Sequence, residues 1–365
     1  MENIMKKKSL KTIIAIILAL CLVAAAFLIA LSAYGKRQLQ KVPSLSFEEA
    51  LKFTAKGSRD AVITVGIIKD GNADFSVYGE DGKLLEKTSH VYEIGSLTKT
   101  FTAAMIAKAA VDGKIDIENS IADYLPLSEK NTYPSIKRVI THTSGYKPYY
   151  FESPMIGNFL SGRNDFCGIT KSILEKRLNN LSIKPNDYAF NYSNFGYATL
   201  GLVLESVYGT DYTSLFNAYA KDLGLENTKI SDGTGDLSNY WDWKEQDAYL
   251  SAGGATSDIN DMLKYASLLL EGYKELGDCR IGLETIDATT EQYELLGIRM
   301  DEIGMAFIID SQNGIVWHNG GTGNYNCYLG FCPDKNIAVV VLSNQKPSYR
   351  IPATVLGIKL LKELS

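Results

Sequence analysis

The chain has 365 residues, of which 45% are apolar and 22% are charged, and its 42 acidic and 37 basic side chains give a formal net charge of −5. This composition excludes a disordered chain, a collagen-like repeat and a small disulfide-rich scaffold. The acidic balance also argues against a nucleic-acid partner, because nucleic acids bind to clustered basic surfaces.

Charge and hydropathy separate an N-terminal leader from the rest of the chain. Residues 1–41 contain seven basic side chains and one acidic side chain, which leaves a formal net charge of −11 for the remainder. Residues 12–35 contain no charged side chain, and about 20 apolar residues are enough for a helix that crosses a bilayer. We therefore expect a cytoplasmic basic N-terminus at 1–11, a transmembrane signal anchor at 12–35 and a linker at 36–44.

The charges on both sides of the apolar segment predict its orientation. Four lysines precede the segment and three basic residues follow it, and basic residues stay on the cytoplasmic side of a membrane. We expect a single-pass protein of the cell membrane whose domain, at 45–365, lies outside the cytoplasm. Two alternatives are cleavage of the segment as a secretory signal and lipidation at Cys21, which follows a loose lipobox.

The other four cysteines of the chain do not predict a metal site. Their spacing is scattered, and a body of this size needs no disulfide for stability. The sequence leaves open whether these cysteines form disulfides. The four residues are Cys167, Cys279, Cys327 and Cys332.

The body begins with two helices that flank a β-hairpin. The first predicted helix covers 47–56, and β-rich runs at 61–68 and 73–80 are joined by four residues that include the Gly and Asn typical of a turn. Apolar residues at helical spacing predict a second helix from about 97 to 112.

The rest of the body changes from helical to β character. The middle, at about 115–300, reads as mostly helical with long loops, and it includes a periodic helix at 259–270. Four β-rich runs follow, at 305–310, 314–319, 325–332 and 337–344. A last helix extends through Leu364. Strands near both ends of the body predict one sheet assembled from both ends, with a helical region inserted.

A serine and a lysine three residues apart are the first candidate catalytic pair. Ser96 and Lys99 fit the pattern S-x-x-K, whose two side chains share one face of a helix. The pattern also occurs at Ser144–Lys147 and Ser343–Lys346, but only Ser96 follows a glycine and opens an apolar helix. Amides at the start of a helix stabilise a developing anion. The alternative interpretation is that Ser96 is only an N-cap.

Two further motifs contain a tyrosine and a histidine. Tyr192 and Asn194 form the only Y-x-N of the chain. The ordinary pKa of tyrosine, about 10, is too high for a base at neutral pH, but a Lys99 cation would lower it. His318 ends a β-rich run and precedes a glycine cluster, which lets a substrate backbone approach closely. The alternatives are a loop tyrosine and a hairpin with an incidental histidine.

The order S-x-x-K, Y-x-N, H-x-G resembles the serine β-lactamase and penicillin-binding-protein superfamily. The most similar branch contains class C β-lactamases, D-alanyl-D-alanine carboxypeptidases and family VIII esterases. The likeness covers roughly 45–350 and includes the blocks IKRVITHTSG, FNYSNFGYATLG and SAGGATSDINDMLKYA. It implies an α+β fold, with a mainly antiparallel β-sheet flanked by helices and a large helical insertion, here preceded by the transmembrane helix.

The resemblance also implies a role for each residue of the first two motifs. Ser96 would be the nucleophile, Lys99 its activating neighbour, and Tyr192 the general base that later protonates the leaving group. Water would then hydrolyse the acyl-enzyme, in a two-step covalent scheme.

The same resemblance implies how the substrate is held. Asn194 would bind the substrate amide or orient the activating lysine, and His318 and Gly320 would line the opposite wall. The backbone amides of Ser96 and Gly321 would form the oxyanion hole, in which each donor stabilises the tetrahedral intermediate by a few kcal/mol.

One residue departs from the pattern of many β-lactamases. They have a lysine where this chain has His318, and K-[ST]-G does not occur in the chain. Histidine is mostly neutral at pH 7, so it holds a substrate carboxylate less firmly than lysine does. This difference favours the carboxypeptidase-like and esterase-like members. A further family block, His142–Gly145, is expected to be a structural helix end and turn.

The motifs predict an extracytoplasmic, membrane-anchored serine hydrolase that acts through an acyl-enzyme on an amide or ester. A D-alanyl group of cell-wall material is the expected substrate, and a class C-like β-lactamase or a carboxylesterase is the alternative. A non-catalytic envelope sensor or regulator is the alternative from another class, and an intact nucleophile with its base argues against it. No cofactor and no metal is expected, and the oligomeric state is left open.

Overall fold

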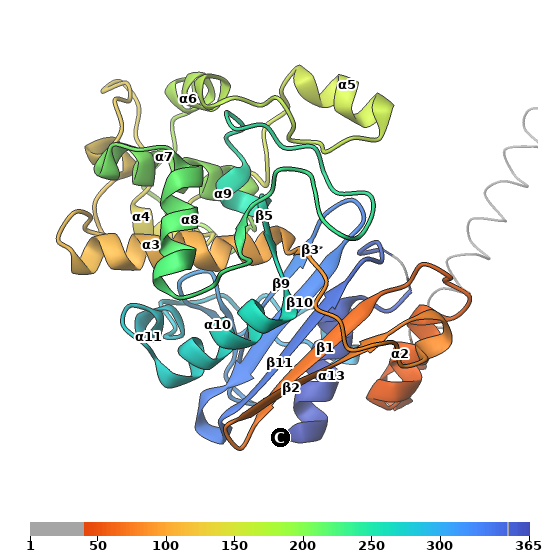
Figure 1. Cartoon of the computed structure of the whole chain (residues 1–365). Coiled ribbons are helices and arrows are strands. Elements are labelled where there is room, and N and C mark those ends of the chain that lie inside the picture. The colour runs from red at the N-terminus through yellow and green to blue at the C-terminus, as the bar shows by residue number, and fades with distance from the viewer. Residues whose placement is uncertain (1–39, 349) are drawn as a thin grey trace, which may run out of the picture. The chain divides into compact units, whose positions relative to one another are not determined.

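An eight-stranded sheet is built from both ends of the body (Figure 1). The computed structural model describes residues 40–348 and 350–365, and the predicted segments at 1–11 and 12–35 lie outside this part. Neighbouring strands are antiparallel throughout the sheet. From edge to edge the strands are β2 (Asn72–Tyr78), β1 (Ile63–Lys69), β11 (Ile337–Ser343), β10 (Asn326–Cys332), β9 (Ile315–Gly321), β8 (Ile308–Asp310), β7 (Glu302–Ile303) and β6 (Glu284–Thr285).

The strands from the two ends meet in the middle of the sheet. Asp70 and Gly71 make the turn of the β1–β2 hairpin with φ angles of 53° and 75°, which aspartate and glycine tolerate best. β1 then pairs with β11, with Ile63 opposite Ser343. All residues of β10 and β11 are buried, which explains their almost uninterrupted apolar sequence.

Helices cover both faces of this sheet. They are α2 (Phe47–Ala55), α10 (Ile259–Glu271) and α13 (Ala353–Leu364). Gly357 of α13 lies against Tyr328 of β10, whereas α10 lies over Gly66 of β1, which shares a cross-strand row with Leu329. Because adjacent residues of a strand face opposite sides, α13 and α10 pack on opposite faces. α2 packs beside α13.

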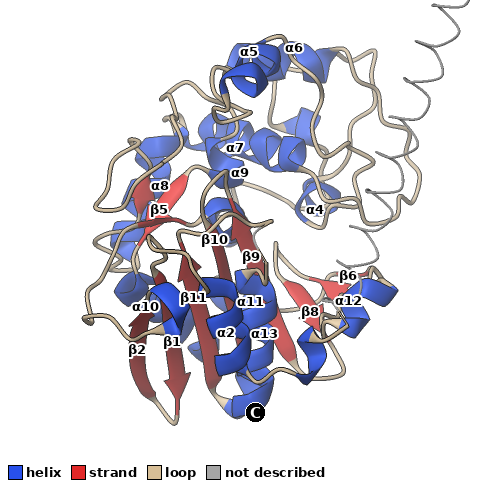
Figure 2. Ribbon diagram, turned by 90° about the vertical axis from the view of Figure 1, so that its right-hand side faces the viewer, coloured by secondary structure: helices blue, strands red, loops and turns tan. Residues whose placement is uncertain are grey.

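The helical region is inserted between β2 and the C-terminal strands, and α5, α6, α7 and α9 lie above the sheet in Figure 2. Its helices are α3 (Thr98–Val111), α4 (Ile136–Ile140), α5 (Pro154–Ser161), α6 (Lys171–Asn179), α7 (Asn194–Tyr208), α8 (Tyr212–Asp222), α9 (Leu250–Gly253), α11 (Leu276–Cys279) and α12 (Glu291–Leu295). A second, small sheet has the strand order β3 (Tyr92–Glu93), β5 (Ala255–Ser257), β4 (Lys229–Ile230). In the described residues, no helix combines the length and the apolar character needed to cross a bilayer.

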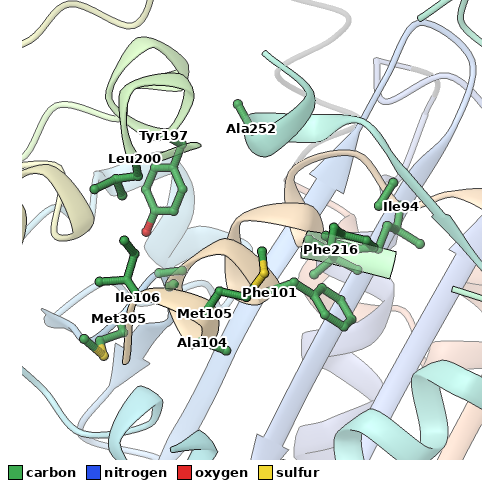
Figure 3. Packing of buried hydrophobic residues seen from close by; sticks show 14 of the residues in the cluster. Ile94, Phe101, Ala104, Met105, Ile106, Tyr197, Leu200, Phe216, Ala252 and Met305 are labelled. Carbon is green, nitrogen blue, oxygen red and sulfur yellow. The ribbon is translucent and has the colours of Figure 1, made fainter. Parts of the chain in front are cut away.

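Helix α3 is buried on nearly all sides, which explains why its apolar residues are not confined to one face. Figure 3 shows side chains of α3, among them Phe101 and Met105, near labelled side chains of α7, α8 and α9. Phe101 stacks on Tyr265 of α10 with 4.2 Å between ring centres, and it contacts Phe216 of α8 at 5.3 Å. The helix that follows Ser96 is therefore held both by α10, which packs on the main sheet, and by α8 of the helical region.

The α+β architecture, the helices flanking the hairpin and the antiparallel sheet are confirmed. The run at 305–310 differs, because only its second half is a strand. Ala306 has a φ of 72°, and the N–H of Gly304 donates to the carbonyl of Phe307 at 2.8 Å, which makes a tight turn there. Strands β6 and β7 were not predicted, since two-residue strands have too little periodicity to be recognised.

Candidate active site

Ser96 lies in a tight turn between β3 and α3. It is the middle residue of a 3-10 helix, Gly95–Leu97, which we call the serine turn. Gly95 has a φ of +50°, and a Cβ atom there would lie 2.6 Å from the backbone nitrogen of Gly321. Only glycine therefore allows this turn to lie so close to β9. Ser96 itself stays half-buried and accessible.

Lys99 is fully buried and makes three hydrogen bonds at the centre of the site. Its Nζ lies 2.9 Å from the Oγ of Ser96, 2.7 Å from the Oδ1 of Asn194 and 2.5 Å from the carbonyl oxygen of Ala252. The predicted pair of serine and lysine is thus in direct contact, and the contact of Asn194 fits the second of its two expected roles, the orientation of Lys99.

The protonation of Lys99 follows from its surroundings. Burial lowers the pKa of Lys99 well below its ordinary value of 10.5. A neutral amine has two N–H groups and one lone pair. The oxygens of Asn194 and Ala252 accept the two N–H groups, so the lone pair remains for the Ser96 hydroxyl. The geometry suits an amine that accepts the proton of the nucleophile.

Tyr192 lies beside the same two side chains. The Nζ of Lys99 lies 4.9 Å from the centre of its ring, and its hydroxyl is hydrogen-bonded to Ser96. Burial nevertheless raises the pKa of Tyr192, and the bond with Ser96 opposes this only in part. Burial therefore favours the neutral phenol of Tyr192 over the phenolate that a Lys99 cation was expected to produce. Lys99 is fully buried and Tyr192 is half-buried, and burial favours the neutral form of each group.

The start of α7 places the Y-x-N motif. Ser193 is the N-cap, and its hydroxyl accepts the N–H of Gly196 at 2.9 Å and donates to the carbonyl of Lys147 at 2.7 Å. Serine is a favoured residue at this position. Because the cap fixes the chain at this residue, Tyr192 and Asn194 on either side of it point into the site together.

Gly320 and Gly321 bring the end of β9 against the serine turn. A Cβ atom at Gly320 would lie 1.9 Å from the carbonyl oxygen of Ile94. The N–H of Thr322 donates to the carbonyl of Tyr325 at 2.9 Å, and bonded and non-bonded pairs alternate along an antiparallel ladder. The N–H of Gly321 is therefore directed away from β10, on the side of the serine turn, as an oxyanion hole requires.

His318 lies on the same strand and is only 1% exposed. Its Nδ1–H donates to the carbonyl of Asn319 at 2.6 Å, and its ring centre lies 6.1 Å from that of Tyr192. Burial lowers the pKa of His318 to about 3. His318 is thus neutral at physiological pH, and this wall does not carry the cation that lysine would supply.

His142 contributes a contact that the sequence did not predict. It forms the helix end and turn expected of its block, with a φ of 57°. Its carbonyl accepts the N–H of Asn191 at 2.8 Å, its Nδ1 accepts the N–H of Ser193 at 3.0 Å, and its ring lies 4.4 Å from the ring of Tyr192. Both neighbours of Tyr192 in the chain are therefore held by this one residue.

Glu93 is the second residue that the sequence did not single out. Its buried carboxyl group accepts the N–H of Trp241 at 2.5 Å and the hydroxyl of Thr322 at 2.6 Å. It thereby connects β3, the residue after Gly321 and the loop that carries Trp241. No short-range pattern reveals such a contact, because both partners of Glu93 are far from it in the sequence.

The carboxyl group of Glu93 predicts a pH-dependent stability. Burial raises its pKa from 4.5 to about 7, so between these values the folded protein keeps a proton that the unfolded chain has lost. The free energy of unfolding should therefore fall as pH rises from about 4.5 to about 7, by roughly 3 kcal/mol from this group. Glu93→Gln mimics the protonated acid and should remove this dependence.

The measurement is chemical denaturation of wild type and Glu93→Gln between pH 5 and pH 8. The difference between the two proteins cancels the contributions of other titrating groups, and the variant should gain relative stability as pH rises. A difference that does not change with pH would contradict the raised pKa of Glu93.

The cysteines and potential metal ligands add no further centre. The four cysteines of the body are free thiols, and all are buried. Among the described residues, no three His, Cys, Asp or Glu side chains are grouped closely enough to hold a metal ion.

Similarity to known proteins covers nearly the whole body. A family model described as Beta-lactamase matches residues 55–358. Protein flp of Staphylococcus aureus strain MRSA252 is 23% identical over 321 residues, which cover 78% of this chain and 59% of that relative. The chain thus spans about 59% of the length of this curated relative.

Solved structures show the same fold. The crystal structure of a β-lactamase/D-alanine carboxypeptidase from Yersinia pestis, complexed with citrate, has a TM-score of 0.68 at 19% identity and covers 90% of this chain and 98% of its own. The crystal structure of SurE with D-Leu has a TM-score of 0.63 at 19% identity, with coverages of 90% and 74%. With the family model matching most of the chain, this protein belongs to the β-lactamase family of serine hydrolases.

Proposed function

We propose that the protein cleaves an amide or ester through an acyl-enzyme on Ser96. The observation that carries this proposal is the buried amine of Lys99, whose Nζ lies 2.9 Å from the Oγ of Ser96 and is held by two further oxygens. A binding module has no need of a buried lysine whose lone pair is aimed at a serine, because such burial costs stability.

The protons move through neighbouring groups. Lys99 takes the proton of the Ser96 hydroxyl as its Oγ attacks the acyl carbon, and the oxyanion is bound by the N–H groups of Ser96 and Gly321. The neutral phenol of Tyr192 donates its proton to the departing oxygen or nitrogen, and Lys99 then returns a proton to Tyr192. Water releases the acyl group by the same steps in reverse.

We propose a D-alanyl group of cell-wall material as the physiological substrate. The proposal is supported by the likeness to the Yersinia pestis β-lactamase/D-alanine carboxypeptidase and to SurE, whose structure contains D-Leu. An ester hydrolase is the second candidate, because the neutral His318 leaves the wall of the site without a cation for a substrate carboxylate. The uncharged segment at 12–35 supports a membrane anchor with this domain outside the cytoplasm.

A substrate panel tests the proposal. Purified full-length protein is assayed with a D-alanyl-D-alanine peptide, a short-chain ester and a chromogenic β-lactam. Release of D-alanine at the highest kcat/KM supports the peptidase, and faster turnover of the ester favours the second candidate. If the protein binds these compounds but turns over none of the three, the result would favour a sensor and would overturn the proposal.

A further inference from the structure

The space beside Ser96 is small and lined by aromatic side chains. Ser96, Asn194 and Gly321 border a cavity of about 40 Å³. Four aromatic residues complete its wall, and no lining residue carries a charge. They are Phe166, Trp241, Trp243 and Tyr249. A cavity of this size accommodates only a small group.

The rings of this wall support one another. Phe166 stacks on Tyr249, with ring centres 4.3 Å apart, and Trp241 meets Trp243 edge to face at 5.9 Å. A Cβ atom at Gly323 would lie 2.5 Å from the indole nitrogen of Trp241, so this ring is packed directly on the backbone. Movement of one ring therefore disturbs its partners.

Two carboxylates, the half-buried Asp242 and the buried Asp247, connect the loops that carry these rings. Asp242 accepts hydrogen bonds from the Nε of Arg163 at 2.9 Å and from the Sγ of Cys167 at 3.4 Å. Asp247 accepts the N–H groups of Gly168 at 2.8 Å and of Lys244 at 2.9 Å. The segments on both sides of the cavity are thus tied together, which keeps the wall from opening easily.

The cavity takes the acyl side of the substrate. With its oxygen between the N–H groups of Ser96 and Gly321, the acyl carbon directs its two other substituents to different places. The leaving group must lie next to Tyr192, which protonates it, and Tyr192 does not line the cavity. The remaining substituent, on the acyl side, points into the cavity.

We infer that the cavity beside Ser96 accepts only short, uncharged substituents on the acyl side, such as the methyl group of an acetyl residue or the methyl side chain of a D-alanyl residue. Phe166 and Trp243 set this limit. The inference rests on the proposed acyl-enzyme at Ser96, and it adds the size and charge of the acyl group. In a pocket of fixed shape, each methylene group that does not fit lowers the kcat/KM of a substrate by about 10-fold or more.

The test uses p-nitrophenyl esters of increasing acyl length with full-length protein. We expect kcat/KM to fall at least about tenfold from acetate to octanoate, and at least about tenfold from butyrate to the charged hemisuccinate. Phe166→Ala and Trp243→Ala should raise the ratio of octanoate to acetate by about tenfold. Phe159→Ala is the matched control, since this phenylalanine of α5 is 79% exposed.

The outcomes separate the size limit of the cavity from the proposed acyl-enzyme. Esters that acylate Ser96 in intact-mass spectra but are turned over equally at all lengths overturn the size limit and leave the proposed function in place. The size limit also fails if Phe166→Ala and Trp243→Ala change the ratio no more than Phe159→Ala does, with all variants folded by circular dichroism. A hemisuccinate turned over as fast as the butyrate overturns the charge limit. Absence of acylation by every ester overturns both the inference and the proposed function.

Discussion

Ser96→Ala should lower kcat/KM by at least about 10³-fold and abolish covalent labelling by a serine-reactive acylating probe. The substitution removes the only atom that the serine turn presents to Lys99 and the oxyanion amides together, so no other group can form the acyl-enzyme. Intact-mass spectrometry after incubation with the probe measures the label directly, and substrate turnover measures the loss of rate.

The chain provides a matched control for this experiment. Ser144 also begins an S-x-x-K pattern, but it is buried, and its Oγ accepts the N–H of Tyr146 at 3.3 Å. Ser144→Ala should therefore keep both labelling and turnover. Persistent labelling of Ser96→Ala, at the same stoichiometry as wild type, would show that another residue is the nucleophile.

The three motifs could be predicted because each is local. In S-x-x-K, one turn of helix brings Ser96 and Lys99 together, and in Y-x-N a single cap residue places Tyr192 and Asn194. The glycines after His318 reveal a close approach of two backbones without showing which segment approaches. The structure supplies that partner, the serine turn, through the contact of Gly95 with Gly321.

The supporting contacts could not be predicted, because they join distant parts of the chain. The ring of His142 reaches Ser193 across 51 positions, and Glu93 reaches Thr322 across 229. Burial is equally hidden in the sequence. A lysine beside a tyrosine suggests a cation and a phenolate, but the fold buries Lys99 fully and Tyr192 in part, and this burial favours the neutral form of both groups.

Lys99→Arg separates the two functions that a lysine could have here. Arginine keeps the positive charge at every accessible pH and cannot accept the proton of Ser96. If Lys99 acts as the base, the variant should lose about 10²–10⁴-fold in kcat/KM, with no recovery at high pH. If Lys99 acted only as a cation, the variant would keep much of its activity.

Wild type should show the complementary pH profile. As a base, Lys99 works after it has lost its proton, so kcat/KM should rise with pH and level off once Lys99 is neutral. Because burial lowers the pKa of Lys99 well below 10.5, this plateau should be reached well below pH 10.5, whereas an exposed lysine would still be charged there. His318, with its pKa lowered to about 3, stays neutral over this range and adds no step to the profile.

Lys108→Arg is the matched control, on the same helix α3. The Nζ of Lys108 forms a partly exposed ion pair with Asp112 at 2.9 Å, which arginine can also make, so this variant should keep the wild-type profile. Lys99→Met tests whether loss of the amine alone suffices, and it should be as inactive as Lys99→Arg while remaining folded by circular dichroism. Substantial activity in Lys99→Arg would assign the proton of Ser96 to Tyr192 instead, and the buried phenol would then have to ionise against the burial that raises its pKa.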